Sequence, residues 1–509
     1  MTVAFCSGTA RRVDPEGLHP SPPAKLTIDR IPLPAEEFRP HLACSRRMRI
    51  RTWAESSFGH AHLGDMRRTR RLVSMAENVA RRPGGRVTDV FRTGATRQAA
   101  YDFLEHDSVS ADEVGKAMFT ATAGSVRDLD RVLVAVDGSS LNLTEGADKG
   151  FGSIGTISCG ARGLKVMSAL ALSEDGVSIG LVDQVWWART ERAKARGYRP
   201  ADQRESAYWR AVVANVTARF AQHAPSTRAH FLFDREGDAA LLLQAVVASG
   251  HEFTCRAKPN RKVVIGGRRC DVRQQLRGLR ALATMTVDLP TTPKRRGRLA
   301  TLDVWAARLP VVMRDNHLHN RRVVPLTVVW VRERGRSLSR GGLDWFLYTN
   351  VGVSSAADAR AVVARYTRRW RIEEFHRAWK SGVCRTEETQ LRSRTAVIKW
   401  ATILAAVATR AERLRLLARE SPADPASVEF TDDEILALVT LRSEARPRDK
   451  VSSEGLTVGL AVRWIADLGG YVGTKSSGPP GTVTISRGLD SLLVAAAVIE
   501  KLRAAGRLR

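Results

Sequence analysis

Three carboxylic acids of this chain have the surroundings that phosphodiester chemistry requires. Asp137 ends the apolar run RVLVAVD, Asp234 ends the apolar run HFLFD, and Glu373 lies in a segment with helical periodicity. Side chains at the ends of buried strands leave the sheet into a crevice, and their carboxylate oxygens are ligands that Mg²⁺ prefers. Two such ions can hold both the attacking and the leaving oxygen of a phosphodiester. An acid at one strand end more often caps a turn, so neither aspartate is specific by itself.

The segment around Glu373 is more informative. In a continuous helix at about 100° per residue, four side chains fall within an arc of roughly 60°: Tyr366, Arg369, Glu373 and Lys380. A neighbouring apolar stripe is expected to pack inward and holds Ile372, Phe375 and Trp379. An acid for a metal and cations for phosphates on one stripe suit a phosphodiester site. The alternative, a salt-bridged surface helix, does not explain why the phenol and the cations share the acid's stripe.

Other candidate residues give weaker signals. Glu374 points about 100° away from Glu373 on a helix, so Glu373 is the better candidate ligand. The scattered histidines have no metal-binding spacing, and His376 is expected on the surface of its helix. Trp186 and Trp187 are expected to be packing residues more than a platform for a nucleobase.

The elements that must position the three acids follow an α/β pattern. Strands are expected at residues 131–137, 164–171, 177–185, 230–234 and 252–256, and helices at 205–222, 239–249 and 356–377. Strands that alternate with helices, with apolar runs ending in acids, indicate a sheet with polar groups at one strand edge. Residues 258–350 contain strands separated by basic turns, which predicts a β-rich insertion. The expected catalytic domain therefore has two parts, residues 121–257 and 351–395.

Helical regions are expected on both sides of this domain. Residues 46–120 include a helix that Asp65 can cap, with an apolar face from Leu72 to Val79 and several arginines on its outer face, followed by a helix over residues 96–104. Such an arginine face suits DNA phosphates, and a solvated helix face is the alternative. Residues 396–509 are expected to be helical, with breaks at 420–433 and 475–481. Residues 1–45 contain many prolines and no clear periodicity, which predicts a poorly ordered extension.

The charge of the chain indicates a polyanionic partner. Lysine and arginine number 81 against 53 aspartates and glutamates, a net charge of +28. Nucleic acid is the usual partner of such a surplus, although an arginine-rich chain from a high-GC genome is the alternative. The six cysteines stand singly, which argues against zinc and disulfide frameworks. The longest apolar runs, such as 401–408 and 492–499, are shorter than a membrane span, so a soluble protein is expected.

The chain resembles the IS-four family of insertion-sequence transposases. Within YTRRWRIEEFHRAWK, Tyr366, Arg369, Glu373 and Lys380 match that family's YREK signature. The segments HFLFDREGDA and VLVAVDGSSLNLT resemble the surroundings of its second and first catalytic aspartates. WAESSFGHAHLGDMRRTRRLV resembles its domain that recognises transposon ends, and WIADLGGYVGTK resembles its C-terminal domain. The similarity runs from about Trp53 to the C-terminus.

The resemblance implies a role for each matching residue. Asp137, Asp234 and Glu373 correspond to the metal-binding triad of a ribonuclease-H-like domain that uses two Mg²⁺ ions, with Mn²⁺ able to substitute. The residues that match DNA-backbone contacts beside the cleaved bond are Tyr366, Arg369 and Lys380. Trp345 matches a tryptophan that stacks on a flipped base, and Arg68 and Arg71 match contacts to the transposon end.

The implied activity is cut-and-paste DNA transposition. Hydrolysis at a transposon end would release a 3′-hydroxyl, which attacks the opposite strand to form a hairpin before the end joins target DNA. The implied partners are double-stranded DNA, at the terminal inverted repeats and the target, and a second subunit bound through residues 396–509. A bacterial cytoplasmic location at the nucleoid follows.

Two departures and three rival functions remain at this stage. Gly138 follows the first aspartate where the family leads us to expect threonine, and residues 1–45 have no assignable counterpart. A non-catalytic DNA-binding relative would be expected to lose one of the acids, and all three are present. A ribonuclease-H-like nuclease or resolvase would not need the end-binding, dimerisation and Trp345 segments. A basic structural protein would not need the acid stripe.

Overall fold

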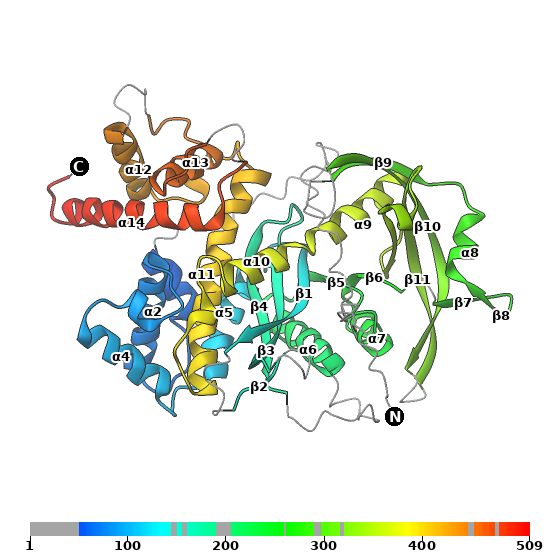
Figure 1. The fold of residues 1–509 in the computed structure, drawn as a ribbon, viewed down its shortest axis with the longest axis horizontal. Coiled ribbons are helices and arrows are strands. Elements are labelled where there is room, and N and C mark those ends of the chain that lie inside the picture. Colours follow the sequence, from blue (N-terminus) through cyan, green and yellow to red (C-terminus); the bar gives the residue numbers. More distant parts are fainter. Residues whose placement is uncertain are drawn as a thin grey trace, which may run out of the picture.

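The structure is a computed structural model in which helices flank one large mixed sheet (Figure 1). It describes residues 50–143, 150–154, 160–189, 205–258, 261–289, 297–315, 320–445, 452–473 and 478–508. The expected extension over residues 1–45 lies outside the described residues. The fold is therefore a mixed α/β arrangement, as expected from the alternating pattern.

Helices make up the N-terminal part of the described chain. They are α1 (Ile50–Phe58), α2 (Met66–Arg81), α3 (Val87–Val90), α4 (Gly94–Glu105) and α5 (Ala111–Ser125). Asp65 caps α2, because its Oδ1 accepts a hydrogen bond from the Arg67 backbone at 2.7 Å. Leu72, Met75 and Val79 form the buried face of α2. The predicted cap and apolar face of this helix are confirmed.

The sheet has β1 at the junction of its antiparallel and parallel parts. On one side β1 (Arg131–Asn142) pairs antiparallel with β3 (Arg162–Leu172), which also pairs with β4 (Ser178–Trp187) and the short β2 (Gly152–Ser153). On the other side β1 pairs parallel with β5 (Arg228–Phe233), which pairs parallel with β6 (Glu252–Arg256). The β1–β5 pairing ends at Ala135 and Leu232, so a step forms where β1 continues beyond its neighbour.

Helices cover both faces of this part of the sheet. On one face, α6 (Glu205–His223) and α7 (Ala240–Ala248) pack on alternate apolar residues such as Val134, Val136 and Phe231. On the other, α10 (Arg371–Lys380) and α11 (Arg394–Glu420) pack on Leu133 and Ala135. β1 is therefore buried on both faces, which explains its unbroken apolar run.

The expected β-rich insertion is continuous with the same sheet. Its elements are β7 (Lys262–Ile265), β8 (Arg268–Asp271), α8 (Val272–Arg277), β9 (Ala283–Leu289), β10 (Arg298–Asp315), β11 (Asn320–Glu333), η4 (Leu338–Arg340) and β12 (Asp344–Thr349). β12 pairs antiparallel with both β11 and β6, which joins the insertion to the central strands. One face of the insertion packs against α9 (Ala356–Arg368).

The helical segment that carries the acid stripe is interrupted. We expected a continuous helix over residues 356–377, but α9 ends at Arg368 and α10 begins at Arg371. The backbone N–H groups of Arg369, Trp370 and Ile372 each bond to a carbonyl three residues earlier, at 3.1, 3.3 and 3.2 Å. The arc calculated for a continuous helix therefore does not apply across this interruption.

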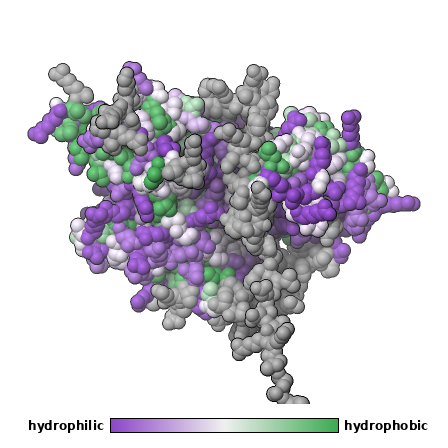
Figure 2. Space-filling view, turned by 45° about the horizontal axis from the view of Figure 1, so that its top comes forward, coloured by the Kyte–Doolittle hydropathy of each residue, from purple (hydrophilic) through white to green (hydrophobic). Residues whose placement is uncertain are grey.

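The C-terminal part consists of helices packed on the end of α11. These are α12 (Asp432–Ala445), α13 (Val458–Leu468) and α14 (Thr482–Ala504), with the short η6 (Ala426–Val428) before them. A further short helix, η5 (Thr386–Glu388), lies between α10 and α11 in the chain. By length and composition α14 could cross a membrane, although its 18-residue window is 28% buried within the protein. Its exposed apolar side chains include Val494 and Val498 (60% and 53% exposed). Figure 2 shows hydrophobic patches on the side of the molecule that carries the C-terminal helices, within a mainly hydrophilic surface.

Helix α11 connects the N-terminal helices to the part of the sheet formed by β1, β3 and β4. The Lys399 ammonium is buried and donates to the backbone carbonyls of Leu104 and His106, each at 2.9 Å. The indole of Trp400 donates to the Gly85 carbonyl at 2.7 Å. These contacts give a donor to the buried carbonyls of Leu104 and Gly85, and a second donor to the His106 carbonyl, which also accepts from the Val109 backbone at 3.1 Å.

We predict that Lys399→Met lowers the free energy of unfolding by about 1–3 kcal/mol, because it removes the side-chain donor of the buried Leu104 carbonyl. Lys116→Met is the matched control, since Lys116 is exposed and lies on α5, and its effect should stay within about 0.5 kcal/mol. Urea unfolding followed by circular dichroism measures both. Equal stabilities of the two variants would contradict a structural role for Lys399.

Candidate active site

The three acids reach one region from three different elements. Asp137 does not end its strand as expected, because β1 continues to Asn142; it lies two residues beyond the last β1–β5 pair. Asp234 follows β5 directly, and its Oδ1 accepts hydrogen bonds from the backbones of Glu236 (2.7 Å) and Gly237 (3.3 Å). Glu373 lies in the first turn of α10. The step at the end of β5 thus brings Asp137 and Asp234 to the same edge.

Arg369 links two of these acids. It lies in the interruption between α9 and α10, where the whole residue is 6% exposed. Its Nη1 lies 3.3 Å from Asp137 Oδ2, and its Nη2 lies 2.6 Å from Glu373 Oε1. The guanidinium therefore joins β1 to α10 across 232 residues of sequence. The predicted proximity of Arg369 and Glu373 is present, although it arises from the turn and not from a continuous helix.

Burial and mutual repulsion make the acids reluctant to ionise together. Burial raises the pKa of Asp137 to about 7, and the charges of Asp234 and Glu373 add to this rise while Arg369 opposes it. The pKa of Glu373 is also raised, mainly by burial. Burial alone would lower the pKa of Arg369, but the neighbouring carboxylates outweigh it and the pKa is raised. The site thus concentrates negative charge around one buried cation.

Tyr366 and Trp345 lie beside this cluster and touch each other. Their rings are 5.9 Å apart in an edge-to-face arrangement, and both side chains are buried. The guanidinium of Arg256, at the end of β6, lies 5.6 Å from the Trp345 ring. Burial raises the pKa of Tyr366 to about 12, with Arg369 and Arg256 opposing the rise. The structure therefore places Tyr366 close to Arg369, and Trp345 against Tyr366 and Arg256.

The remaining predicted DNA contacts make no recorded bond to the three acids within the described part of the chain. Lys380 ends α10, and its Nζ lies 3.5 Å from Glu387 of η5. Arg71 is exposed on α2. Arg68 is only half-exposed, because its Nη1 donates to the Leu63 carbonyl at 3.0 Å. For Arg71, by contrast, the structure records no side-chain bond to a backbone carbonyl of the described residues. Arg71 is therefore the more available of the two predicted contacts to the transposon end.

Gly138 leaves space beside the first acid. A Cβ atom there would meet Met167 Cε at 3.5 Å, an ordinary van der Waals distance. The Gly138 backbone donates to Asp137 Oδ1 at 2.8 Å. The missing side chain therefore removes no contact that orients Asp137, and a backbone bond holds that carboxylate.

Sequence reasoning missed the role of Glu374 and misplaced His376. Glu374 Oε2 accepts from Arg371 at 2.9 Å and from Arg415 of α11 at 2.8 Å, and these cations lower its pKa against the effect of burial. Arg415 also bonds to Glu412, which accepts from Thr482 at 2.6 Å. The abundance of paired Arg and Glu in α10 and α11 was the available signal.

His376 is buried, contrary to the expected surface position. It packs against Phe375 and Trp379, with ring centroids 5.3 and 6.4 Å away. Burial lowers its pKa to about 3, with Lys380 and Arg369 adding to the effect. The predicted inward stripe of Ile372, Phe375 and Trp379 is confirmed, since all three are fully buried. His376 is a neutral packing residue on the same side.

The donor chemistry of the three acids suits a divalent cation. Carboxylate oxygens are the usual protein ligands of Mg²⁺. Within the ranges that the structure describes, no group of three or more His, Cys, Asp or Glu side chains is gathered closely enough to hold a metal. Between Asp137 and Glu373 lies the Arg369 guanidinium instead. The three carboxylates thus have the ligand chemistry that Mg²⁺ prefers. Arg369 sets the spacing between Asp137 and Glu373.

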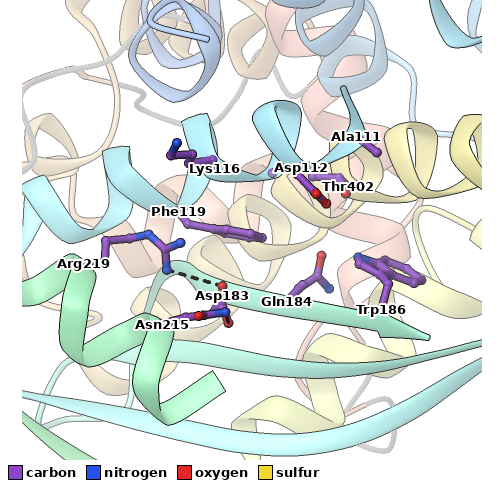
Figure 3. Close-up of a pocket in the computed structure, with 11 residues that line it drawn as sticks. Ala111, Asp112, Lys116, Phe119, Asp183, Gln184, Trp186, Asn215, Arg219 and Thr402 are labelled. Carbon is purple, nitrogen blue, oxygen red and sulfur yellow. Dashed lines mark hydrogen bonds and ion pairs between the residues drawn. The ribbon is translucent and has the colours of Figure 1, made fainter. Parts of the chain in front are cut away.

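A separate cavity lies between α5, β4, α6 and α11 (Figure 3). Its volume is about 220 Å³, and Asp183, Asn215 and Arg219 lie on its wall. The Asp183 carboxylate accepts from Asn215 at 2.9 Å and from Arg219 at 3.4 Å. None of the predicted site residues borders it, and this polar group holds α6 on the sheet.

The expected packing role of the adjacent tryptophans agrees with their contacts. Trp187 is buried and stacks on Tyr208 of α6, with ring centroids 3.9 Å apart. Trp186 meets Trp379 of α10 edge to face at 5.8 Å. Both rings therefore fix helices on opposite faces of the sheet.

Two ranges of the chain match protein families. Residues 50–109 match the family described as transposase DNA-binding, and residues 194–410 match the transposase DDE domain. Asp234 and Glu373 lie within the second range, whereas Asp137 lies between the two. A solved structure of the piggyBac transposase synaptic complex with hairpin DNA is similar at a TM-score of 0.31 and 7% identity. That similarity covers 69% of this chain and 56% of the other, and establishes nothing about activity.

The neighbours Glu373 and Glu374 provide a matched test of the site. Glu374→Gln leaves two buried arginines undercompensated, so it should lower the free energy of unfolding by about 3–5 kcal/mol. Glu373→Gln removes a carboxylate whose charged form is already disfavoured by burial and by Asp234, and Arg369 keeps Asp137 as a partner, so its cost should be below about 1 kcal/mol. Denaturant unfolding of both variants measures the difference. A larger loss for Glu373→Gln would show that Glu373 is chiefly structural.

Proposed function

Since the chain contains a transposase DNA-binding domain and a transposase DDE domain, we propose that it is a cut-and-paste DNA transposase. The observation that carries the proposal is the meeting of Asp137, Asp234 and Glu373 around one edge of the sheet, with Arg369 between two of them. The fold of this region is proposed to be ribonuclease-H-like. The YREK match further supports membership of the IS-four family, with particular likeness to the Tn-five transposase.

The three carboxylates are proposed to hold two Mg²⁺ ions, for which Mn²⁺ can substitute. Bound there, such ions supply activation of the attacking hydroxyl and neutralisation of charge on the scissile phosphate. The protein's own part is to bind and orient the DNA strand. Arg369 can offer two parallel N–H donors to a phosphate, and Tyr366 and Lys380 are proposed to hold the backbone on either side.

The proposed hairpin step requires a base near the cut to leave the stack. Extrusion of a base costs a few kcal/mol, and stacking on an aromatic ring can return about 1–3 kcal/mol. Trp345 is the proposed platform, and its contact with Tyr366 supports a position beside the cleaved strand. Because its side chain is 6% exposed, Tyr366 or Arg256 must move for a base to reach the ring.

DNA-end recognition is proposed for the N-terminal helices. Arg67, Arg70 and Arg71 are exposed on α2, within the range that matches the transposase DNA-binding family. Arg71 is the stronger candidate for a phosphate contact. Arg68 can act directly only if it gives up its bond to the Leu63 carbonyl, so an indirect role in shaping the end of α2 is proposed for it.

The assembly is proposed to be a homodimer in which each subunit cuts one transposon end. Exposed apolar residues of α14, among them Val494 and Val498, support a contact surface in the expected dimerisation region. The partners would be inverted-repeat ends and target DNA, and the location would be the bacterial cytoplasm at the nucleoid. A ribonuclease-H-like nuclease is the rival, and the transposase DNA-binding match disfavours it.

The first functional prediction concerns the acids. Asp137→Ala, Asp234→Ala and Glu373→Ala should each reduce DNA cleavage by about 10³-fold or more, because each removes a metal ligand, while DNA binding persists. The measurement is a denaturing-gel time course on a labelled duplex that carries the element's terminal inverted repeat, resolving nicked, hairpin and double-strand-break products. Asp303→Asn, in the insertion, is the control that should cleave normally. A variant that nicks at the wild-type rate loses its assignment as a ligand.

The second functional prediction concerns the ends. Arg71→Ala should weaken binding and reduce the slope of log affinity against log salt by about 0.9, the value for one lost phosphate contact. Gel shifts at several salt concentrations, with end DNA and random DNA in parallel, provide the measurement. Arg360→Ala, a change of the same type on α9, should leave the slope unchanged. An unaltered slope for Arg71→Ala would exclude its phosphate contact.

A further inference from the structure

Arg369 occupies a place that conflicts with its proposed role on DNA. A guanidinium that bonds to Asp137 at 3.3 Å and to Glu373 at 2.6 Å cannot at the same time direct those N–H groups at a phosphate. The two carboxylates are likewise committed to a monovalent cation. The Arg369 side chain is 7% exposed, whereas the side chains of Asp137 and Glu373 are 20% and 28% exposed, so the guanidinium has few partners other than the acids.

We propose that Arg369 is an internal counter-ion that keeps Asp137 and Glu373 from binding metal until DNA is bound. Phosphate would draw the guanidinium away, and the released carboxylates would then close on the divalent cation. The inference rests on the proposed function and adds an order of events to it. Metal loading and substrate binding become coupled through one side chain.

Electrostatics supports mutual exclusion. A divalent cation within a few ångströms of a buried guanidinium meets strong repulsion, because screening by water is weak there. Around Arg369 the charged groups are Asp137, Asp234, Glu373 and, farther out, Arg256 and Arg377. With the guanidinium in place, one positive charge already offsets part of the acidic cluster. With it withdrawn, the acids repel one another and favour a cation of higher charge.

The backbone around Arg369 suits a side chain with two positions. It lies at the end of α9, where the chain makes three-residue turns before α10 begins. A residue between two helices can change its backbone angles without unwinding either helix. Phosphate oxygens also accept bidentate, charge-assisted bonds from arginine. A DNA phosphate can therefore replace the carboxylates of Asp137 and Glu373 as the partner of Arg369.

The test measures Mn²⁺ binding by the full-length protein without DNA. Electron paramagnetic resonance reports binding as a loss of the signal of free Mn²⁺. Arg369→Gln should bind Mn²⁺ at least about tenfold more tightly than the wild type, since the competing cation is gone. The gain should vanish in Arg369→Gln combined with Asp137→Ala. The matched control is Arg377→Gln. Arg377 is exposed and its charge lowers the pKa of Glu373, but the structure records no side-chain bond between Arg377 and Glu373.

Two contrary results have different meanings. Asp137-dependent Mn²⁺ binding that is equal or weaker in Arg369→Gln overturns the counter-ion role and leaves the proposed function intact. The measurement is repeated with a 20-base-pair duplex, and the Mn²⁺ bound by the duplex itself is subtracted. If no protein then shows Mn²⁺ binding that depends on Asp137, the proposed metal site and the inference are both overturned. Equal tightening by Arg377→Gln would show a general charge effect and also overturns the inference.

A second variant guards against misfolding. If Arg369→Gln fails to unfold cooperatively, Arg369→Lys keeps the charge but replaces the planar fork by a single ammonium that cannot bridge both acids in the same way. It should tighten Mn²⁺ binding by a smaller factor than glutamine, and thermal unfolding confirms its fold. Wild-type affinity in a folded Arg369→Lys protein would mean that the bridge between the two acids does not restrain metal binding.

Discussion

The approach of Asp137 and Glu373 at one edge of the sheet requires compensation, and Arg369 provides it. These two carboxylates have raised pKa values, because desolvation disfavours their charged forms. A single guanidinium placed between them allows the strand and the helix to approach. Apolar packing of Ile372, Phe375 and Trp379 holds α10 on the sheet, and the Arg369 bonds set how Asp137 and Glu373 face each other.

A second set of ion pairs holds α10 from its other side. Glu374 binds Arg371 and Arg415, and Glu412 extends the contacts from Arg415 to Thr482 at the start of α14. The consecutive residues Glu373 and Glu374 of α10 therefore face different partners. Glu373 faces the cluster of acids, while Glu374 fixes the helix to α11 and, through it, to the C-terminal helices. Buried pairs of this kind specify an arrangement more than they stabilise it.

Helix α11 transmits this arrangement to the N-terminal helices. Lys399 and Trp400 bind backbone carbonyls near α4 and before α3, so the region that matches the DNA-binding family is attached to the same helix that anchors α10. The N-terminal helices, the sheet and the C-terminal helices are thus all in contact with α11.

Much of this could be predicted from sequence, for a physical reason. Strand and helix periodicities report burial on one or two faces, so the apolar runs before Asp137 and Asp234 and the inward stripe of Ile372 and Phe375 were visible in the residue order alone. Residue chemistry likewise singled out the acids and cations. What the sequence determined was therefore which groups are available and which face of each element they occupy.

Only the tertiary structure decided how those groups meet. The interruption of the helix at Arg369 depends on packing of α9 on the insertion and of α10 on β1, which no local pattern encodes. The continuation of β1 beyond Asp137 reflects its pairing with β3, and the burial of His376 follows from neighbours far away in sequence. The choice of Arg369 as the partner of Asp137 joins residues 232 apart. Such contacts are set by the balance of burial and charge in the whole fold, so local periodicity cannot determine them.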